Sequence, residues 1–478
     1  MSLSPSLFRF AGCDSARLGF SCLVAPCRIR VERMERGHAI HGSGTTQVSA
    51  MECGSMSLSR GWVSTLDGSA SASAGSAVEL CASASSNTVS LGGLQWDVYN
   101  PSGKYRVVVT KKLVGDLWLD VLTSRDFRVE VCQSELTLSQ QQIMAAMGSR
   151  CDGVIGQLTE KWDDTLFVAL KRAGGKAYSN VAVGFDNVDV DAATRHGIAM
   201  GNTPGVLTEA TAEMAVSLVY ACARRVVEAD AYLRAGKWKN WLPTLFIGKL
   251  LSRKTVGIVG AGRIGSTVGL MLVRGAMMDL VYYDKYQNKQ FEAKLDSFAR
   301  ALAEHGEEPI RWRRVDSVED VLRAADVVSL HPNLDKTTFH LMNAERLKMM
   351  KPDAILINCA RGPVVDETAL VEHCRATPTF YAGLDVFEDE PQLKPGLDQL
   401  ENVVIVPHIA SATVWTRAGM STLAACNVSS VVLGQPTLAS LDILPHVNAP
   451  GATQVPPTAP AIVNAKALGL PAAAAPKM

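Results

Sequence analysis

The sequence has no excess of charge of either sign. Its 47 lysines and arginines balance 47 aspartates and glutamates, so the formal net charge is zero. Nucleic acids and anionic membranes attract proteins that carry an excess of positive charge, and we therefore expect neither as a partner. The sequence also contains no apolar run near the roughly 20 residues that a membrane-spanning helix needs. We predict no membrane span.

Cysteine motifs are also missing. The 11 cysteines are scattered, without a CxxC pair or a cluster of histidines and cysteines. This pattern argues against both a zinc site and a disulfide framework, and we predict no bound metal. Cys359 lies close to a candidate active-site arginine, but we interpret it as a small buried residue.

Lysine is absent before Lys104, and the strongly basic residues upstream of it are all arginine. Residues 1–95 are also rich in Ser, Ala and Gly. This composition is typical of a mitochondrial or chloroplast transit peptide followed by a disordered spacer. A misassigned start codon, or a tail without an address, is the alternative. The C-terminal residues 476–478, PKM, form only a weak version of a peroxisomal signal, which we keep as an alternative localisation.

A dinucleotide-binding fingerprint occupies residues 254–284. A β-branched run is followed by Gly260, Gly262 and Gly265 at the GxGxxG spacing, and then by a helical pattern. The first glycine permits a sharp turn, the second lets N–H groups approach a pyrophosphate, and the third lets the helix pack against the strand. Asp284 ends the next apolar run, where a carboxylate can bind a ribose 2′-OH. The fingerprint therefore predicts NAD(H), with a structural turn or a flavin site as the alternative.

Segments typical of strands and helices alternate from residue 105 onward, which predicts parallel α/β sheets. Residues 208–236 predict one long connecting helix, and residues 285–314 predict a surface helix without a catalytic role. The predicted organisation is a first part of the substrate domain at 96–207, a dinucleotide-binding domain at 208–412, a helix of the substrate domain at 413–445 and a flexible tail at 446–478.

Polar residues follow the successive predicted strands of the second domain. These residues are Asp284, His331, Arg361, Asp385, Glu390 and His408. Ligands of open α/β sheets bind beyond the carboxyl ends of the strands. We therefore expect these side chains to converge on one crevice.

Three of them suit the reduction of a 2-keto acid by a nicotinamide cofactor. The planar guanidinium of Arg361 can bind a carboxylate through two N–H groups. An imidazole titrates near neutral pH, so His408 is suited to donate a proton, and Glu390 can stabilise the imidazolium. Each residue alone has an ordinary interpretation as a helix cap, a turn residue or a surface charge. Their joint position after the fingerprint favours catalysis.

Four segments carry a family resemblance. INCARGPVVDE, GLDVFEDEP and PHIAS resemble the catalytic-domain signatures of the D-isomer-specific 2-hydroxyacid dehydrogenases, and GAGRIG resembles their cofactor signature. The resemblance covers residues 105–434. It implies two doubly wound parallel-sheet domains, with a Rossmann NAD domain inserted in a flavodoxin-like substrate domain. It also implies a homodimer that acts on a small 2-keto or 2-hydroxy acid.

The resemblance further implies roles for single residues. The implied catalytic residues are Arg361, Glu390 and His408. Arg361 polarises the carbonyl, Glu390 tunes His408, and His408 is the acid and base. The substrate is expected at Val183, Gly184, Arg361 and His408, with its carboxylate on the backbone of the first two. The NAD(H) contacts are expected at Gly260, Gly262, Arg263, Ile264, Gly265, Asp284, His331, Pro332, Thr337, Cys359, Ala360, Asp385 and His408, with Asp385 holding the nicotinamide carboxamide.

Within this family the sequence resembles the plant-type NADH-dependent hydroxypyruvate reductases, in segments such as GNTPGVLTEATAE and LHPNLDKTT. The implied reaction reduces hydroxypyruvate to D-glycerate, as in photorespiration, with glyoxylate reduced to glycolate as a smaller substrate. The long N-terminal extension departs from these enzymes. Two alternatives stay open: a dehydrogenase for another D-2-hydroxy acid, and an NAD-sensing binding protein of the corepressor type.

Overall fold

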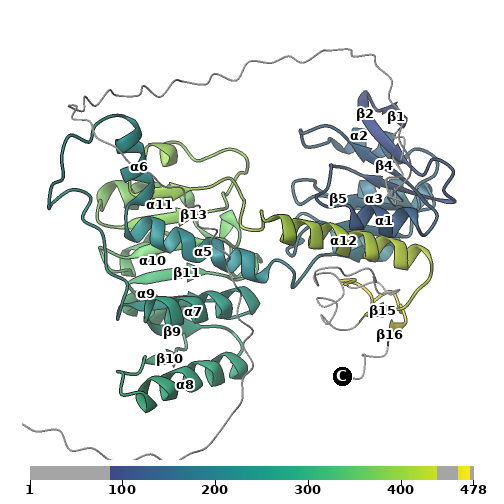
Figure 1. Ribbon diagram of the computed structural model, residues 1–478. Coiled ribbons are helices and arrows are strands. Elements are labelled where there is room, and N and C mark those ends of the chain that lie inside the picture. Colours follow the sequence, from purple (N-terminus) through teal and green to yellow (C-terminus); the bar gives the residue numbers. More distant parts are fainter. Residues whose placement is uncertain (1–86, 439–460, 474–478) are drawn as a thin grey trace, which may run out of the picture. The chain divides into compact units, whose positions relative to one another are not determined.

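Two seven-stranded sheets, each covered by helices on both faces, organise the chain (Figure 1). The structure is a computed structural model, and it describes residues 87–438 and 461–473. The first lobe consists of residues 87–207 together with helix α12 (Val414–Val432). The second lobe consists of residues 208–410. Within the described residues, no helix combines the length and the apolarity that a membrane crossing requires.

The sheet of the second lobe is parallel throughout, in the order β10-β9-β8-β11-β12-β13-β14. Its strands are β8 (Thr255–Val259), β9 (Asp279–Tyr283), β10 (Trp312–Arg314), β11 (Val327–Leu330), β12 (Ile355–Asn358), β13 (Tyr381–Leu384) and β14 (Val403–Ile405). Within this sheet the chain begins with the central strand β8 and continues through β9 to the edge strand β10. It then crosses back to β11, on the other side of β8. This reversal between β8 and β11 opens a crevice beyond the carboxyl ends of the strands, as in the Rossmann fold.

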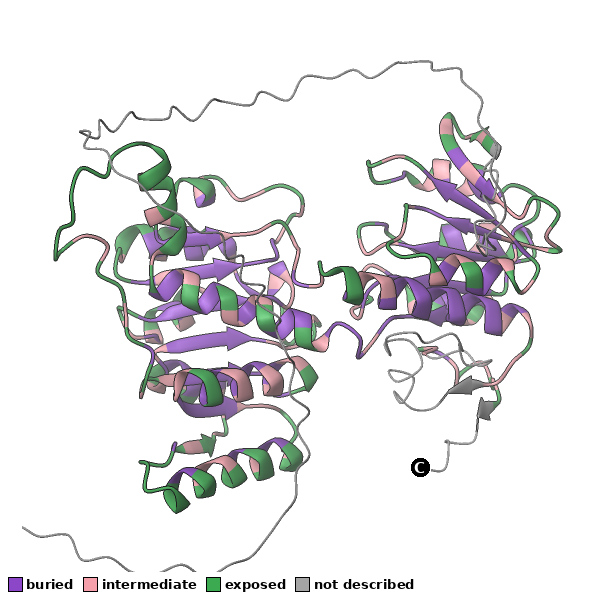
Figure 2. Cartoon of the chain, viewed as in Figure 1, coloured by how far each residue is buried: buried purple, intermediate pink, exposed green. Residues whose placement is uncertain are grey.

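Helices cover both faces of this sheet because alternate residues of each strand point to opposite sides. On one face Ile258 packs with helices α5 (Thr208–Ala223), α7 (Arg263–Ala276) and α8 (Lys289–Glu304). On the other face Val259 belongs to the core under α9 (Val318–Ala324), α10 (Ala344–Met349) and α11 (Glu367–Ala376). Figure 2 shows that the strands are buried while the outer sides of these helices are exposed.

The sheet of the first lobe has the order β1-β2-β4-β3-β5-β6-β7. Its strands are β1 (Asn87–Leu91), β2 (Leu94–Tyr99), β3 (Tyr105–Val109), β4 (Phe127–Cys132), β5 (Gly153–Gly156), β6 (Ala177–Asn180) and β7 (Ala199–Gly201). From β4 to β7 the strands are parallel, in the flavodoxin-like order. The predicted pair of doubly wound α/β domains is therefore confirmed. The first sheet additionally carries β1 and β2, which pair in antiparallel fashion at its edge.

Helices also cover both faces of the first sheet. Helices α1 (Leu117–Thr123) and α12 form one side of the core. Helices α2 (Gln140–Met147), α3 (Asp164–Arg172) and α4 (Val190–Arg195) form the other. Fourteen of the 19 residues of α12 are buried, which explains why its sequence lacks an amphipathic pattern. Helix α12 thus returns to the first lobe, as the sequence predicted.

Two predicted boundaries are wrong. The spacer predicted at 1–95 extends too far, because residues 87–91 and 94–99 form the β1–β2 hairpin. Residues of β2 alternate between buried and partly exposed. This alternation was not recognised in the sequence, because the Ser- and Ala-rich stretch before it has the composition of a spacer. The tail predicted at 446–478 is ordered at residues 461–473, which we call the C-terminal segment and which pairs with β7 at Gly201. The transit peptide and the PKM signal lie outside the described residues.

Two further predictions need correction. The long helix predicted at 208–236 is broken into α5 and α6 (Val226–Arg234), because Arg225 adopts a left-handed conformation with φ of 53°. The inserted segment 285–314 forms the predicted surface helix as α8, but it also ends in β10, an edge strand beside β9. A three-residue strand is too short to leave a periodic pattern in the sequence.

Candidate active site

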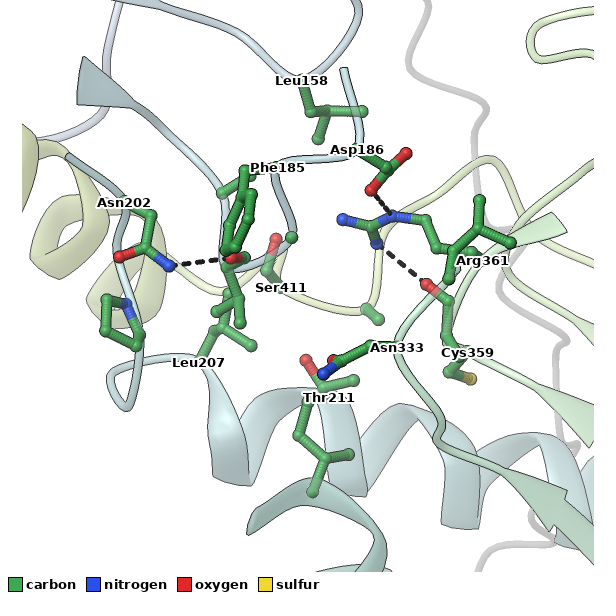
Figure 3. A pocket seen from close by; sticks show the side chains of 18 of the residues that line it. Leu158, Phe185, Asp186, Asn202, Leu207, Thr211, Asn333, Cys359, Arg361 and Ser411 are labelled. Atoms are coloured by element: carbon green, nitrogen blue, oxygen red, sulfur yellow. Dashed lines mark hydrogen bonds and ion pairs between the residues drawn. The ribbon is translucent and has the colours of Figure 1, made fainter. Parts of the chain in front are cut away.

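A cavity of about 750 Å³ is lined by residues of both lobes. It lies beyond the carboxyl ends of the second sheet, where the fingerprint loop meets the loops after β11, β12 and β13. The predicted site residues that line it are Val183, Gly184, Arg263, Ile264, His331, Pro332, Cys359, Ala360, Arg361, Asp385 and His408. Figure 3 shows part of this lining, with Arg361 directed toward the loop that carries Phe185 and Asp186.

The glycine turn after β8 has the geometry that the fingerprint predicted. Gly260 has φ of 91°, and a Cβ there would lie 2.7 Å from the backbone of His331. A Cβ on Gly265 would lie 2.0 Å from the carbonyl oxygen of Gly260, so only glycine allows α7 to approach the strand. At Gly262 a Cβ would meet nothing within 4 Å, and this residue caps α7 without a side-chain hydrogen bond. The open N-terminus of α7 therefore fits a pyrophosphate.

Asp284 lies directly after β9, on the same edge of the sheet. Its Oδ1 accepts a hydrogen bond of 2.8 Å from the backbone N–H of Tyr286. The carboxylate therefore closes a short turn and is held at a strand end, the position at which an acid binds a ribose diol. Asp284 does not line the cavity itself.

His408, just beyond β14, forms a hydrogen bond with Glu390, which lies in the loop after β13. The distance from His408 Nδ1 to Glu390 Oε2 is 2.9 Å, and the other carboxylate oxygen accepts the N–H of Phe387 at 2.9 Å. Burial raises the pKa of Glu390, but the hydrogen bond and the charge of His408 outweigh burial, so its pKa lies below the ordinary value. Because Glu390 stays ionised and contacts Nδ1, it orients the imidazole and leaves Nε2 available for the cavity.

Asp385 holds the backbone of the loop that carries His408. It is fully buried, and its two oxygens accept the N–H groups of Ile409 at 2.6 Å and Ala410 at 3.1 Å. Burial raises the pKa of Asp385, although these two N–H groups oppose the rise. The N–H of His408 donates to the carbonyl oxygen of Asp385 at 2.9 Å, and His408 itself has φ of 53°. The position of the imidazole thus depends on Asp385.

Arg361 contacts the first lobe through an ion pair that the sequence did not reveal. Its Nε donates to Asp186 Oδ1 at 2.8 Å, and its Nη1 donates to the carbonyl oxygen of Ala360 at 2.8 Å (Figure 3). Its Nη2 lies so close to Gly184 that a Cβ there would be 1.9 Å away. Gly184 is therefore required for the approach of the guanidinium to the loop.

The loop after β6 presents backbone N–H groups beside this guanidinium. The carbonyl oxygens of Ala182, Val183 and Gly184 accept hydrogen bonds from the Thr203 N–H, Asn202 Nδ2 and Asn180 Nδ2 respectively, at 2.8, 2.8 and 3.1 Å. In a trans peptide the next N–H points away from the carbonyl oxygen. Within the described residues, the N–H groups of residues 183–185 have no hydrogen-bond acceptor. They and Arg361 together suit a carboxylate.

Comparison with known proteins agrees with this geometry. Residues 216–410 match the model of the D-isomer specific 2-hydroxyacid dehydrogenase NAD binding domain. A glycerate dehydrogenase of Cucumis sativus is 56% identical over 378 residues, which cover 79% of this chain and 98% of the relative. The chain belongs to the D-isomer-specific 2-hydroxyacid dehydrogenase family.

Other members of the family support the same assignment. A peroxisomal glycerate dehydrogenase of Arabidopsis thaliana is 56% identical over 378 residues, covering 78% of this chain and 97% of the relative. A glyoxylate reductase of Thermococcus onnurineus is 38% identical over 354 residues, covering 73% and 99%. The crystal structure of a Thermus thermophilus protein matches with a TM-score of 0.61 and 38% identity, over 69% of this chain and 97% of that one.

As a member of this family the chain has an NAD-binding domain. Three of its predicted cofactor residues differ in burial and in their hydrogen-bond partners. His331 is held by Ser329 Oγ at 2.8 Å, and burial lowers its pKa to about 3, so it is neutral at physiological pH. Burial raises the pKa of the Cys359 thiol well above its ordinary value, which confirms the interpretation as a small buried residue. Thr337 is exposed, binds Asp335, and does not line the cavity. Its cofactor role stays a prediction.

Proposed function

We propose that this dehydrogenase reduces hydroxypyruvate to D-glycerate with NADH, and glyoxylate to glycolate. The observation that carries the proposal is the arrangement of Arg361, the His408–Glu390 pair and the free N–H groups of residues 183–185 around one cavity. The glycerate dehydrogenases and the glyoxylate reductase among its relatives support these two substrates. The photorespiratory setting is part of the same proposal.

The residues of this chain perform the proposed reaction as follows. The substrate carboxylate binds the N–H groups of residues 183–185, and the guanidinium of Arg361 draws electron density from the keto oxygen. NADH, when bound, supplies the hydride. His408 donates a proton to the oxygen as negative charge develops on it. Glu390 stabilises the imidazolium before the transfer, because it accepts a hydrogen bond from Nδ1.

The charges around the cavity favour a substrate with a single carboxylate. Three aspartates of the segment after β6 line it, Asp186, Asp189 and Asp191, against two arginines, Arg263 and Arg361. A phosphate on the substrate requires additional positive charge. We therefore propose hydroxypyruvate rather than its 3-phosphate, and rank dehydrogenases for phosphorylated 2-hydroxy acids as the weaker alternative.

The test is NADH oxidation by the full chain with hydroxypyruvate, glyoxylate, pyruvate and 3-phosphohydroxypyruvate offered in parallel. We expect the highest kcat/KM with hydroxypyruvate, followed by glyoxylate. A higher value with pyruvate or with the phosphorylated acid would replace the proposed substrate. Tight NADH binding without oxidation of any of the four would favour the NAD-sensing binding protein instead.

We also propose that the enzyme is a homodimer, with a second copy covering α6 and the loop after it. Helix α6 has no buried residue. The exposed apolar side chains of this region are Val226, Val227, Leu233, Trp238, Trp241, Leu242, Ile247 and Leu250. Apolar surface of this extent typically marks a protein interface. Light scattering should give twice the 51.2 kDa mass of the chain, and a monomeric mass at micromolar concentration would exclude the proposal.

The compartment is proposed from the relatives. The peroxisomal enzyme of Arabidopsis thaliana supports the peroxisome, while the composition of residues 1–95 favours a mitochondrion or chloroplast. Two fluorescent fusions discriminate between them, one that leaves the N-terminus free and one that leaves the C-terminus free. Import into a mitochondrion or chloroplast only when the N-terminus is free would identify the N-terminal signal. Import into the peroxisome only when the C-terminus is free would identify the C-terminal one.

A further inference from the structure

The C-terminal segment lies against the edge of the first sheet. Ile462 forms an antiparallel bridge with Gly201 of β7, and the Val463 N–H donates to the carbonyl oxygen of Met200 at 2.7 Å. The segment thus covers the open edge of β7, which otherwise exposes unpaired backbone groups. It begins only a few ångströms from the residue that follows β7, Asn202, because the Asn202 N–H donates to Ala461 O at 3.3 Å.

A buried asparagine attaches the segment to this edge. Asn464 is 5% exposed, and its Oδ1 accepts the N–H of Met200 at 2.9 Å. Its Nδ2 donates to the carbonyl oxygen of Ile198 at 2.9 Å and to Thr194 Oγ1 at 3.0 Å. These three partners lie in α4, in β7 and at Ile198, the residue directly before β7. The side chain therefore fixes the register of the segment on the sheet.

A second buried asparagine joins the segment to helix α12. Asn427 is fully buried, its Oδ1 accepts the N–H of Ala461 at 2.9 Å, and its Nδ2 donates to the carbonyl oxygen of Asn202 at 2.9 Å. A Cβ on Gly201 would lie 2.6 Å from this Nδ2, so glycine is required for the approach. The N–H of Asn202 is thus held by the segment, and its carbonyl by Asn427.

The side chain of Asn202 carries this constraint to the cavity. Its Nδ2 donates to the carbonyl oxygen of Val183 at 2.8 Å (Figure 3). The Gly184 N–H belongs to the same peptide unit and points the opposite way. Gly184 in turn lies against Nη2 of Arg361. A continuous series of hydrogen bonds therefore leads from Ala461 through Asn202 to the N–H group beside the catalytic guanidinium.

We infer that the C-terminal segment is a positioning element of the substrate site, which holds the carboxylate-binding loop in place through Asn202. The inference rests on the proposed function, because it assigns the N–H groups of residues 183–185 to the carboxylate of the 2-keto acid. The segment does not touch the substrate. It acts by keeping the Val183 carbonyl turned toward Asn202.

A purely structural role makes a different prediction. If the segment only covers the edge of β7, its loss lowers the melting temperature and leaves the kinetics of the folded enzyme unchanged. If it positions the loop, its loss raises the KM of every 2-keto acid while the KM of NADH stays the same, because the cofactor binds the other lobe. The two KM values therefore separate the roles.

The first test is Asn464→Ala in the full chain, with Lys466→Ala as the matched control. Lys466 lies in the same segment, and its side chain is exposed. We expect Asn464→Ala to raise the KM of hydroxypyruvate and of glyoxylate roughly fivefold, the effect of one weakened hydrogen bond, with the KM of NADH unchanged. We expect wild-type values for Lys466→Ala. An unchanged KM for both acids in folded Asn464→Ala protein would overturn the inference.

The second test removes the segment and returns it. A chain that ends at Leu438 should show a larger rise in the KM of both acids, and a synthetic peptide of residues 461–473 should reverse it at saturating concentration. A return of the KM of both acids to the wild-type value supports the positioning role. Recovery of stability without that return would contradict it. If the truncated chain does not fold, the Asn464→Ala result decides. A wild-type enzyme that reduces no 2-keto acid would instead refute the proposed function.

Discussion

The two lobes contribute to the cavity in different ways. The second lobe supplies the two side chains to which we assign the chemistry, Arg361 and His408, each just beyond the end of a strand. The first lobe supplies backbone N–H groups of residues 183–185, which are turned into place by Asn180 and Asn202. A side chain that takes part in the reaction can be supplied by a single local segment of the chain. A site made of backbone groups depends on supports from several elements, and it is correspondingly harder to see in the sequence.

We expect the largest loss of activity at His408, because no backbone group can replace a side chain that donates a proton. We expect His408→Gln to lower kcat with hydroxypyruvate about a thousandfold, as for removal of a general acid. The dissociation constant of NADH, measured by fluorescence titration, should not change. A kcat within tenfold of the wild type would remove His408 from the acid role and break the proposed division between the lobes.

Arg361→Lys tests the second chemical side chain of the same lobe. An ammonium group cannot reproduce the planar fork of a guanidinium, so we expect kcat/KM with hydroxypyruvate to fall about a hundredfold, equivalent to roughly 3 kcal/mol of lost charge-assisted hydrogen bonding. Steady-state kinetics with both substrates varied measures the loss. An equal loss of NADH binding would indicate a misfolded cleft rather than a lost substrate contact.

Asp186→Asn probes the contact between the two lobes, because Asp186 is the first-lobe side chain that contacts Arg361. The amide retains a hydrogen-bond acceptor for Nε but removes the negative charge. We expect kcat/KM for hydroxypyruvate to fall about tenfold, as for a weakened charged hydrogen bond, and activity on 3-phosphohydroxypyruvate to rise relative to it. Asp191→Asn is the control for the contact with Arg361, since it removes the same charge from the cavity without touching Arg361, and it should leave kcat/KM for hydroxypyruvate near the wild-type value. The idea fails if both variants lower kcat/KM for hydroxypyruvate equally.

Asp284→Ala tests the cofactor end of the second lobe. The carboxylate should repel the 2′-phosphate of NADPH, so its removal should reduce the preference for NADH about fivefold, by roughly 1 kcal/mol. The ratio of kcat/KM for the two cofactors, at saturating hydroxypyruvate, provides the measurement. An unchanged ratio would show that another residue selects the cofactor.

The smallest effect on activity is expected at Glu367, a carboxyl of the second lobe outside the cavity, where a substitution should change stability instead. Burial raises its pKa to about 7 from 4.5, against the opposing hydrogen bond from the Glu388 N–H at 2.6 Å. The folded protein therefore keeps a proton between these pH values that the unfolded chain has lost. Stability from this group is complete below pH 4.5 and declines as the pH rises toward 7 and above.

Glu367→Gln should flatten this decline. The amide stays neutral at every pH and can still accept the Glu388 N–H, so the loss of unfolding free energy between pH 5 and pH 8 should shrink by about 1 to 2 kcal/mol. Urea unfolding at the two pH values measures it, with Glu372→Gln on the exposed side of α11 as the control. Parallel pH curves for wild type and Glu367→Gln would contradict the expectation.

The second lobe was the easier of the two to predict from sequence. Its strands are buried on both faces and read as short apolar runs that end in a polar residue, so Asp284, His331 and Arg361 were expected where they stand, just beyond β9, β11 and β12. Helix α6 was not separated from α5, because the break at Arg225 is a single left-handed residue that leaves no signal in hydrophobic periodicity.

The ends of the first lobe were not predicted. The β1–β2 hairpin follows a low-complexity stretch, and its Gly92–Gly93 turn resembles a spacer in composition. The C-terminal segment holds five alanines among its 13 residues, and Asn464 is the buried polar side chain that ties it to the fold. The sequence does not distinguish an asparagine in a loop from one in a buried hydrogen-bond network. The partners of Asn464, more than 250 residues away in the sequence, could therefore not be inferred.

The sequence by itself was enough to predict the fold class and the NAD-binding domain, and to nominate Arg361, Glu390 and His408 as candidates for catalysis, since glycine spacing and charged residues at strand ends act through local geometry. The tertiary structure was needed to show that Arg361 meets Asp186, that Asn180 and Asn202 hold the loop of residues 183–185, and that the C-terminal segment pairs with β7. These features join residues far apart in the chain, and contacts of that kind are specified by packing rather than by any local pattern.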